Sequence, residues 1–314
     1  MPAEAPATPR VAVLLPCYNE EVAVADCVRA FKTALPDATV YVYDNNSKDG
    51  TAQRARDAGA VVRTEPLQGK GNVVRRMFAD IDADIYVMAD GDNTYDATSA
   101  PAMVEKLRRE NLDMVVGSRR STYENATYRR GHRTGNFLIT WTVAFLFGDR
   151  FRDMLSGYRV FSRRFVKTFP ALSAGFDIET ELTVHTLSIA LPAAEIETPY
   201  AARPEGSVSK LNTWRDGFRI LRAIVNLFRD ERPLAFFSIL AALLATISVV
   251  IAIPVFVTFL ETGLVPRLPT ALLSASLMLL AFLSLVSGLI LDTVSHGRRE
   301  NKRLHYLGYR PPPQ

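Results

Sequence analysis

The chain has 314 residues, enough for one large domain or two small ones, and a formal net charge of +4. This modest charge excludes a strongly basic nucleic-acid-binding protein, although basic residues concentrate between Arg119 and Arg164 and again beside the apolar segments near the carboxyl end. The two cysteines, Cys17 and Cys27, lack the spacing of a zinc or redox motif, and we expect core thiols of a cytosol-facing domain.

The first two-thirds of the chain alternates strand and helix patterns. Residues 1–10 are rich in Ala, Pro and Thr, which predicts a disordered lead-in and not a signal peptide. Four short apolar or β-branched runs follow: Val11–Leu15, Thr39–Tyr43, Ile85–Ala89 and Met114–Gly117. Between the first two, apolar residues recur at helical intervals, at Val24, Cys27, Val28 and Phe31. This alternation predicts an α/β fold over residues 11–211, a mostly parallel sheet with helices on both faces.

Polar motifs follow three of these strands. Leu15–Glu21 follows the first, Tyr43–Thr51 the second, and Asp90-Gly91-Asp92 the third. Carboxyl ends of parallel strands meet at one edge of a sheet, where open α/β folds bind ligands. Mg²⁺ is typically held by one or two carboxylates, with substrate phosphates and water completing its shell. The acids Asp90 and Asp92 therefore predict a divalent-cation site and a phosphorylated substrate, whereas in isolation they also fit an Asp-Gly turn.

In this order the motifs resemble the nucleotide-sugar half of glycosyltransferase family 2. Its GT-A fold, which is Rossmann-like, reads P-x-Y/N-N-E, then D-D-x-S-x-D-G-T, then D-x-D. The second Asp of the middle motif is Asn45 here, which leaves Asp44 as the base-recognising carboxylate. The resemblance implies that a nucleotide-sugar, which we expect to be a UDP-sugar, is held by Pro16, Tyr18, Glu20, Asp44, Lys70, Asp90 and Gly91. Asp90 and Asp92 are the implied ligands of Mg²⁺ or Mn²⁺.

Further motifs in the second half of the domain resemble those of enzymes that glycosylate polyprenyl phosphates. Asp153–Ser162 matches D-x-x-S-G-Y/F-R, and a later Glu pair is matched by Glu179 and Glu181. The pattern R-x-x-G-x-x-S-K is matched by Arg203, Gly206, Ser209 and Lys210. Dolichyl-phosphate mannose synthases and bacterial undecaprenyl-phosphate glycosyltransferases are similar in these motifs, over roughly Val11 to Lys210. The Q-x-x-R-W signature of processive polysaccharide synthases is missing from the sequence.

Arginines in this half favour a phosphate acceptor, because a guanidinium grips phosphate through paired donors. The acceptor-phosphate candidates are Arg119, Arg129, Arg133, Arg203, Ser209 and Lys210. Arg119 and Arg133 rank first, since they match family positions that contact the lipid phosphate. A phosphate monoester is largely a dianion at neutral pH and needs little help from a general base, whereas a hydroxyl acceptor needs one. Asp153 matches the proposed base of the family, and orientation of the acceptor or metal is an equally good assignment.

The predicted reaction is a single in-line displacement with inversion, from a nucleotide-sugar to undecaprenyl or dolichyl phosphate. Its catalytic residues are Asp92, Asp153, Arg119 and Arg133. Two alternatives stay open. One is a family 2 enzyme that glycosylates a hydroxyl of a membrane lipid or glycan. The other is a non-catalytic membrane scaffold, which is expected to lose the metal acids first, yet both acids are present.

The last third of the chain predicts a membrane hairpin over residues 233–292. Leu234–Leu260 and Leu268–Leu291 contain no ionisable residue, and about 20 apolar residues suffice to cross a bilayer. Buried core helices are the alternative. Basic residues flank both ends, at Arg229, Arg232, Arg298, Arg299, Lys302 and Arg303. The positive-inside rule then puts both termini, including a basic tail over residues 293–314, in the cytoplasm.

An amphipathic helix is predicted just before the hairpin, over residues 212–232. Its apolar face comprises Trp214, Phe218, Leu221, Val225 and Phe228, beside a basic row of Arg215, Arg219 and Arg222. This pattern favours a helix lying in the lipid interface over one packed on the soluble domain. Small residues on the first span, at Ala241, Ala242, Ala245 and Ser248, make a homo-oligomer plausible.

Overall fold

The computed structural model describes residues 9–121, 151–175, 178–201, 222, 225–226 and 228–312. Contacts divide the chain into two units, Met1–Ile220 with Lys302–Gln314, and Leu221–Asn301. Arg10, at the end of the predicted lead-in, already belongs to the fold, because its backbone N–H donates to the Asp84 carboxylate at 2.9 Å.

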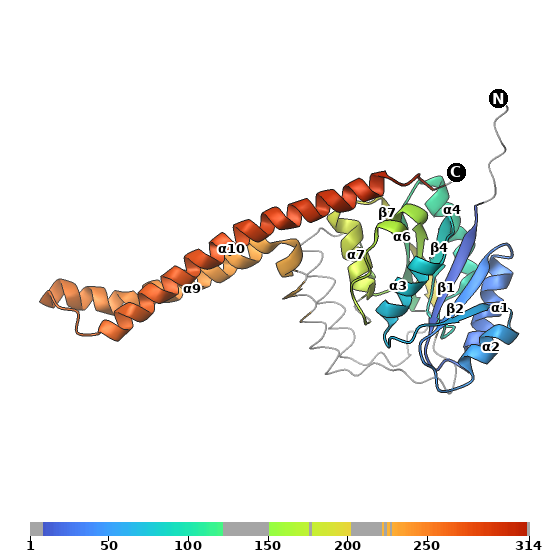
Figure 1. The fold of residues 1–314 in the computed structure, drawn as a ribbon, viewed down its shortest axis with the longest axis horizontal. Coiled ribbons are helices and arrows are strands. Elements are labelled where there is room, and N and C mark those ends of the chain that lie inside the picture. Colours follow the sequence, from blue (N-terminus) through green and yellow to red (C-terminus); the bar gives the residue numbers. More distant parts are fainter. Residues whose placement is uncertain are drawn as a thin grey trace, which may run out of the picture. The chain divides into compact units, whose positions relative to one another are not determined.

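The described part of the first unit contains a seven-stranded mixed sheet with the strand order β3-β2-β1-β4-β6-β5-β7. Figure 1 labels β1, β2, β4 and β7 of this sheet. The strands are β1 (Val11–Cys17), β2 (Thr39–Asp44), β3 (Val61–Thr64), β4 (Ile85–Met88), β5 (Met114–Ser121), β6 (Arg159–Ser162) and β7 (Ala193–Tyr200). Neighbouring strands are parallel except at β6, which runs antiparallel to both β4 and β5. The predicted α/β fold with a mostly parallel sheet is confirmed.

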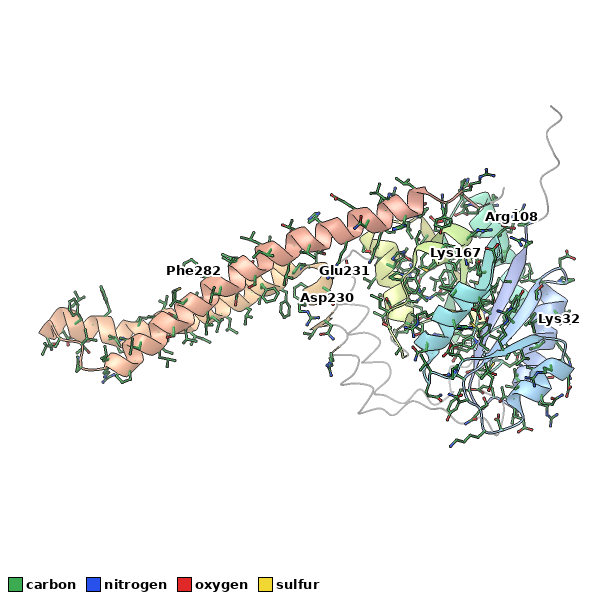
Figure 2. The ribbon with its side chains drawn as sticks, viewed as in Figure 1. Lys32, Arg108, Lys167, Asp230, Glu231 and Phe282 are labelled. Carbon is green, nitrogen blue, oxygen red and sulfur yellow. The ribbon has the colours of Figure 1, made fainter. Side chains whose placement is uncertain are left out.

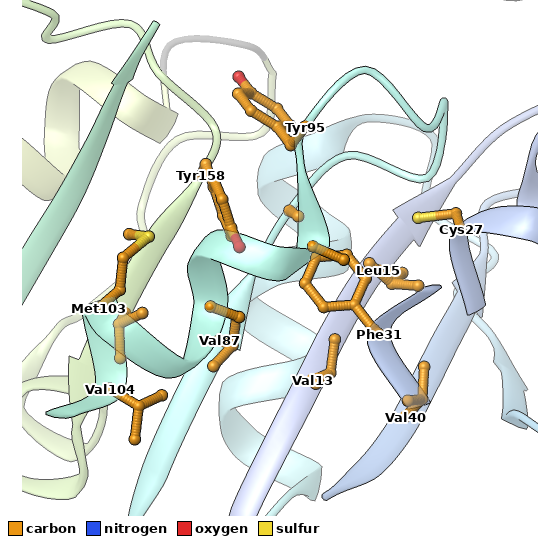
Figure 3. Close-up of a cluster of buried hydrophobic side chains, with 14 of the residues drawn as sticks. Val13, Leu15, Cys27, Phe31, Val40, Val87, Tyr95, Met103, Val104 and Tyr158 are labelled. Atoms are coloured by element: carbon orange, nitrogen blue, oxygen red, sulfur yellow. The ribbon is translucent and has the colours of Figure 1, made fainter. Parts of the chain in front are cut away.

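Helices cover both faces of this sheet. They are α1 (Val24–Ala34), α2 (Thr51–Asp57), α3 (Lys70–Asp80), the 3₁₀ turn η1 (Ala97–Ser99), α4 (Ala100–Arg109), α6 (Arg163–Thr168) and α7 (Ile178–Ser188). On one face, Val13 and Leu15 of β1 lie in a core cluster with Phe31 of α1 and Met103 of α4 (Figure 3). On the other face, the ring of Phe78 in α3 lies 5.7 Å from that of Phe161 in β6. Strands covered on both faces are apolar at successive positions, which explains the continuous runs in the sequence.

The second unit contains the two apolar helices of the predicted hairpin, α9 (Pro233–Thr262) and α10 (Leu268–Leu307). Both are long and apolar enough to span a membrane, and only 11% and 17% of their most apolar windows are buried. Side chains such as Phe282 project from the helices (Figure 2). Core helices of a soluble protein would be largely buried, so the structure favours the candidate membrane spans.

The two apolar helices are joined by hydrogen bonds between serines. Ser248 Oγ donates to the Ser274 carbonyl at 2.8 Å, and Ser274 Oγ donates to the Ser248 carbonyl at 3.0 Å. Ser248 therefore packs within the hairpin, and a homo-oligomer through the small-residue stripe stays a prediction. Of the predicted amphipathic helix, residues 222, 225–226 and 228–231 are helical, and its other positions lie outside the described residues.

The carboxyl-terminal segment forms part of the first unit. Tyr306 Oη donates to the buried carboxylate of Asp113 at 2.8 Å, and Arg164 Nε bonds the same carboxylate at 2.5 Å. The guanidinium carbons of Arg164 and Arg303 lie 4.7 and 5.0 Å from the centre of the Tyr306 ring. The region predicted as a basic tail is thus helical to Leu307 and supplies a buried side chain to the sheet domain.

Candidate active site

The three motifs meet at the carboxyl edge of β1, β2 and β4. Cys17 and Asp44, the last residues of β1 and β2, are partners in the sheet register. Asp90 and Asp92 follow β4, which pairs with β1 on its other side. Pro16, Tyr18 and Glu20 lie at the end of β1 and in the loop behind it, so the structure brings the predicted donor-site residues to one edge.

Asparagines in the left-handed region shape the loops at this edge. Asn19, Asn46 and Asn93 follow β1, β2 and β4, with φ angles of 52°, 62° and 57°. Asn tolerates this conformation better than most residues with a side chain. Asn19 also ties two motifs together, because its Oδ1 accepts from the Lys48 N–H and its own N–H donates to Ser47 Oγ, both at 2.8 Å. None of the three was among the predicted site residues, although Asn19 and Asn46 lie within two of the predicted motifs.

Asp44 presents an unpaired acceptor at this edge. Its Oδ2 accepts from the Ser47 N–H at 3.3 Å, whereas Oδ1 is buried and has no hydrogen-bond partner in the described part of the chain. A buried carboxylate oxygen without a donor is costly, so the geometry provides a place for an N–H group of a ligand.

Asn45 stands where the family motif has Asp. Its side-chain amide anchors the following loop through N–H donors, which an ionised Asp lacks. Its Nδ2 donates to the carbonyls of Glu65 and Leu67, each at 2.8 Å. Its Oδ1 accepts from the Gly69 N–H at 2.7 Å. The side chain therefore uses both amide donors and its acceptor to fix the start of the Gly-Lys-Gly loop.

The Gly-Lys-Gly loop packs directly on backbone. A Cβ on Gly69 or Gly71 would lie 2.2 Å from the Ala174 carbonyl oxygen or 2.0 Å from that of Ser173. Glu181 in turn fixes this partner segment, because its carboxylate accepts from the Leu172 and Ser173 N–H groups at 2.9 and 2.8 Å. The second Glu of the predicted pair thus fixes the segment on which the loop of Lys70 packs.

Asp92 is buried after β4, with Oδ1 accepting from Thr94 Oγ1 at 2.7 Å and from the Thr94 N–H at 3.2 Å. Gly91 allows the loop to lie on β1, since a Cβ there would come within 2.2 Å of Cys17 Sγ. Burial raises the pKa of the Cys17 thiol well above its ordinary value. Cys17 therefore acts as a packing residue beneath the acidic motif, as the sequence predicts.

Lys70 lies between Asp90 and Glu179. Its Nζ forms ion pairs with Asp90 Oδ1 and, at 2.5 Å, with Glu179 Oε1. Burial by itself lowers the pKa of a lysine, but the two carboxylates outweigh it and the pKa of Lys70 lies above its ordinary value. Gly157 closes over this group, because a Cβ there would lie 2.9 Å from Asp90 Oδ2. Lys70 is a fixed buried cation beside Asp90 in the predicted donor site.

Arg119 and Asp153, predicted separately, form a bidentate pair. Arg119 Nε and Nη2 donate to the two carboxylate oxygens at 2.7 and 2.8 Å, and its backbone N–H donates at 3.1 Å. Burial raises the pKa of Asp153, but the Arg119 contacts outweigh it and hold the pKa below the ordinary value. Glu195 fixes the turn by accepting from the Asp153 N–H at 3.1 Å. A carboxylate held in this way is a weak proton acceptor, which favours an orienting role.

Arg159 organises the turn between Asp153 and Gly157 from inside the fold. It is fully buried, and its guanidinium donates to the carbonyls of Met154 and Ser156 at 2.6 and 2.9 Å and to Thr183 Oγ1 at 2.9 Å. Burial lowers its pKa to about 10, so it stays charged at neutral pH. The Arg of the D-x-x-S-G-Y-R motif therefore supports the site without reaching it.

The acids fit a divalent cation that is completed by substrate. Among the described residues, no group of three or more His, Cys, Asp and Glu side chains is placed to hold a metal alone. Asp90 and Asp92 offer hard oxygen donors at the strand end, the number of carboxylates with which Mg²⁺ or Mn²⁺ joins a diphosphate. The other acceptor candidates, Arg129, Arg133, Arg203, Ser209 and Lys210, lie outside the described residues.

A parallel sheet with carboxylates and asparagine-lined turns at its carboxyl edge defines an α/β protein that binds its ligand there. Residues 12–169 match the profile of Glycosyl transferase family 2. The glycosyltransferase AglJ of Haloferax volcanii is 37% identical over 233 residues, 74% of this chain and 76% of AglJ. The chain therefore belongs to glycosyltransferase family 2.

Two further comparisons concern a second relative and the fold. The dolichyl-phosphate hexose transferase of Haloferax volcanii is 27% identical over 222 residues, 71% of this chain and 95% of that protein. Glucosyl-3-phosphoglycerate synthase of Mycobacterium tuberculosis, solved with Mn²⁺, UDP and phosphoglyceric acid, aligns with a TM-score of 0.59 at 22% identity, over 70% of this chain and 78% of that one. This likeness establishes the GT-A fold.

Proposed function

We propose that the protein transfers a sugar, with inversion, from a UDP-sugar to a polyprenyl phosphate at the cytoplasmic face of a membrane. Membership of family 2 supports sugar transfer. The relative named a dolichyl-phosphate hexose transferase supports the lipid phosphate acceptor. The two candidate membrane spans in the same chain support an enzyme that acts where such a lipid is found.

The donor assignment draws on the unpaired Oδ1 of Asp44. Uracil carries one ring N–H, the kind of donor that this buried oxygen lacks. Asp90 and Asp92 are positioned to face the ribose and diphosphate of the same molecule. The neighbouring structure with Mn²⁺ and UDP supports a divalent cation with a uridine nucleotide.

The bidentate Arg119–Asp153 pair is the observation that carries the acceptor assignment. A hydroxyl acceptor requires a base to remove its proton, and Asp153 is held ionised and saturated by Arg119. A phosphate monoester arrives already ionised. The pair therefore fits an acceptor that needs orientation more than proton removal.

In the reaction, an acceptor phosphate oxygen forms a bond to the anomeric carbon as the bond from that carbon to the diphosphate oxygen breaks. The nucleoside diphosphate leaves with the bonding electron pair, and no net proton transfer is required. A bound divalent cation would stabilise the charge of the leaving diphosphate. Lys70 fixes Asp90 in the donor site, and Arg119 holds Asp153 on the acceptor side.

The flanking charges support a topology in which the catalytic domain and both termini are cytoplasmic. Arg229 and Arg232 precede the first span, and Arg298 and Arg299 follow the apolar part of the second. A single cysteine placed at Gly263, between the spans, should then be labelled by an impermeant thiol reagent only from outside intact cells. Labelling from the cytoplasmic side alone would contradict this topology.

The first test is transfer by the purified, detergent-solubilised protein from UDP-, GDP- and dTDP-sugars to undecaprenyl phosphate, with Mn²⁺, Mg²⁺ or chelator. We expect a glycolipid from a UDP-sugar, formed only with metal. Transfer to a lipid or glycan hydroxyl, with none to the prenyl phosphate, would replace this acceptor by the hydroxyl alternative. Nucleotide-sugar binding without turnover on any acceptor would favour the scaffold.

A further inference from the structure

The donor site contains a buried cation whose charge has to be balanced before a metal can bind beside it. The side chain of Lys70 is 9% exposed and lies between Asp90 and Glu179. If Asp90 were its only partner, Asp90 would be neutralised by the lysine. The charge of Asp90 would then be unavailable to a cation.

Glu179 changes this balance. It lies in the first turn of α7, its side chain is 6% exposed, and it pairs with Lys70 through Oε1. Two carboxylates, on Asp90 and Glu179, pair with one ammonium group, which leaves one net negative charge among these three side chains. Asp90 therefore keeps the charge of a carboxylate for a cation.

The second oxygen of Glu179 is also informative. Oε2 is buried and has no hydrogen-bond partner among the residues that the structure describes. A buried ionised oxygen without a donor destabilises the fold, so packing alone gives no reason for a charged residue at this position. A neutral Gln could accept the Lys70 hydrogen bond equally well, and the feature that distinguishes Glu is its charge.

We infer that Glu179 is a positioning residue of the donor site, a buried counter-charge that neutralises Lys70 so that Asp90 remains available to the metal-nucleotide. The inference rests on the proposed function, because it assumes that a divalent cation and a nucleoside diphosphate bind at Asp90 and Asp92. Glu179 acts here through Lys70 and needs no contact with substrate.

The test compares Glu179→Gln with the double variant Lys70→Met/Glu179→Gln in the full-length detergent-solubilised protein. Mn²⁺ binding in the presence of UDP is measured by calorimetry, and UDP binding is measured separately in chelator. Glu179→Gln should weaken Mn²⁺ binding about tenfold or more, since a unit charge is lost near a divalent ion. UDP binding without metal should not weaken.

The double variant removes both charges of the buried pair. Measured at UDP concentrations that saturate each variant, because Lys70 also belongs to the donor site, its Mn²⁺ binding should return to within about threefold of the wild-type protein. Glu197→Gln, on an exposed position of β7, makes the same change in net charge and serves as the control. A purely structural role for Glu179 predicts further loss on adding Lys70→Met. That result, or unchanged Mn²⁺ binding in Glu179→Gln, overturns the inference.

Folding is checked by thermal melting of each variant. If Glu179→Gln does not fold, the double variant alone tests the inference, because it leaves no unpaired buried lysine. Near wild-type Mn²⁺ binding by the double variant supports the inference, and loss of Mn²⁺ binding overturns it. A wild-type protein that binds no UDP, GDP or dTDP nucleotide with Mn²⁺ would instead contradict the proposed function.

Discussion

Replacing Asn45 by Asp restores the residue of the family motif, and we expect it to destabilise this protein. The Asn45 side chain is almost fully buried and donates two hydrogen bonds of 2.8 Å to the Glu65 and Leu67 carbonyls. Asp keeps the acceptor for the Gly69 N–H but has no donor when ionised. Both carbonyls would lose their partner and face a carboxylate oxygen, next to Asp44.

The expected cost follows from these contacts. Two lost hydrogen bonds cost about 1 kcal/mol each, and repulsion at a buried position adds about 1 kcal/mol more. For a domain of this size, about 3 kcal/mol lowers the melting temperature by roughly 6–12 °C. UDP should also bind more weakly, because the loop that leads to Lys70 loses its anchor.

The assay is thermal unfolding of the detergent-solubilised full-length protein, followed by intrinsic fluorescence, beside UDP titration. Asn46→Asp is the matched control: it makes the same change at the adjacent, exposed residue, whose Nδ2 makes a 2.7 Å bond to the Pro66 carbonyl. It should cost less than about 1 kcal/mol. If Asn45→Asp melted no lower than Asn46→Asp, the reasoning about the amide donors would be wrong.

Four further changes test other parts of the molecule. Asp92→Ala should nearly abolish transfer in a folded protein, and activity retained at saturating Mn²⁺ would remove the metal assignment. Arg133→Ala should raise the acceptor KM much more than the donor KM, whereas an effect confined to the donor would contradict the division of the site. Arg119→Met should destabilise the protein near neutral pH. The pKa of Asp153 in the folded protein lies below its ordinary value of 3.8, so the pair with Arg119 stabilises the fold above that pH. The difference in melting temperature between wild type and variant should therefore shrink as the pH is lowered to about 3.5. Tyr306→Phe removes a donor to a buried carboxylate and should cost about 1.5–3 kcal/mol by thermal melting, and an unchanged melting temperature would show that Asp113 finds another donor.

The sequence predicted the sheet where burial produces an uninterrupted apolar run. The four predicted strands correspond to β1, β2, β4 and β5, and the four apolar positions of the first predicted helix are all buried in α1. The strands it missed have local reasons. β3 is short and mostly exposed, and β7 carries two glutamates and a proline. β6 begins with Arg159, and a charged residue is not expected at a fully buried strand position.

The sequence predicted which residues lie at the strand ends that form the candidate site. It did not predict which of their side chains form ion pairs with one another. Motif order places Asp44, Asp90 and Asp92 at one edge. That Lys70 pairs with Asp90 and Glu179, or Arg119 with Asp153, depends on close backbone approaches such as that at Gly157. Such approaches join segments far apart in the chain, and local sequence does not encode them. The role of Asn45 likewise appears only once the carbonyls of Glu65 and Leu67 are in place.

The bond between Tyr306 and Asp113 has a consequence for biosynthesis. Its two ends are separated by 193 residues, and both candidate membrane helices lie between them in the sequence. A ribosome therefore completes the sheet's own strands long before it produces the phenol that pairs with Asp113. Until then, the side-chain partners of this carboxylate among the described residues are Ser162 and Arg164. Final maturation of the catalytic domain is thereby coupled to the synthesis of the hairpin, and nascent chains stalled before Tyr306 should be more sensitive to protease than the finished protein.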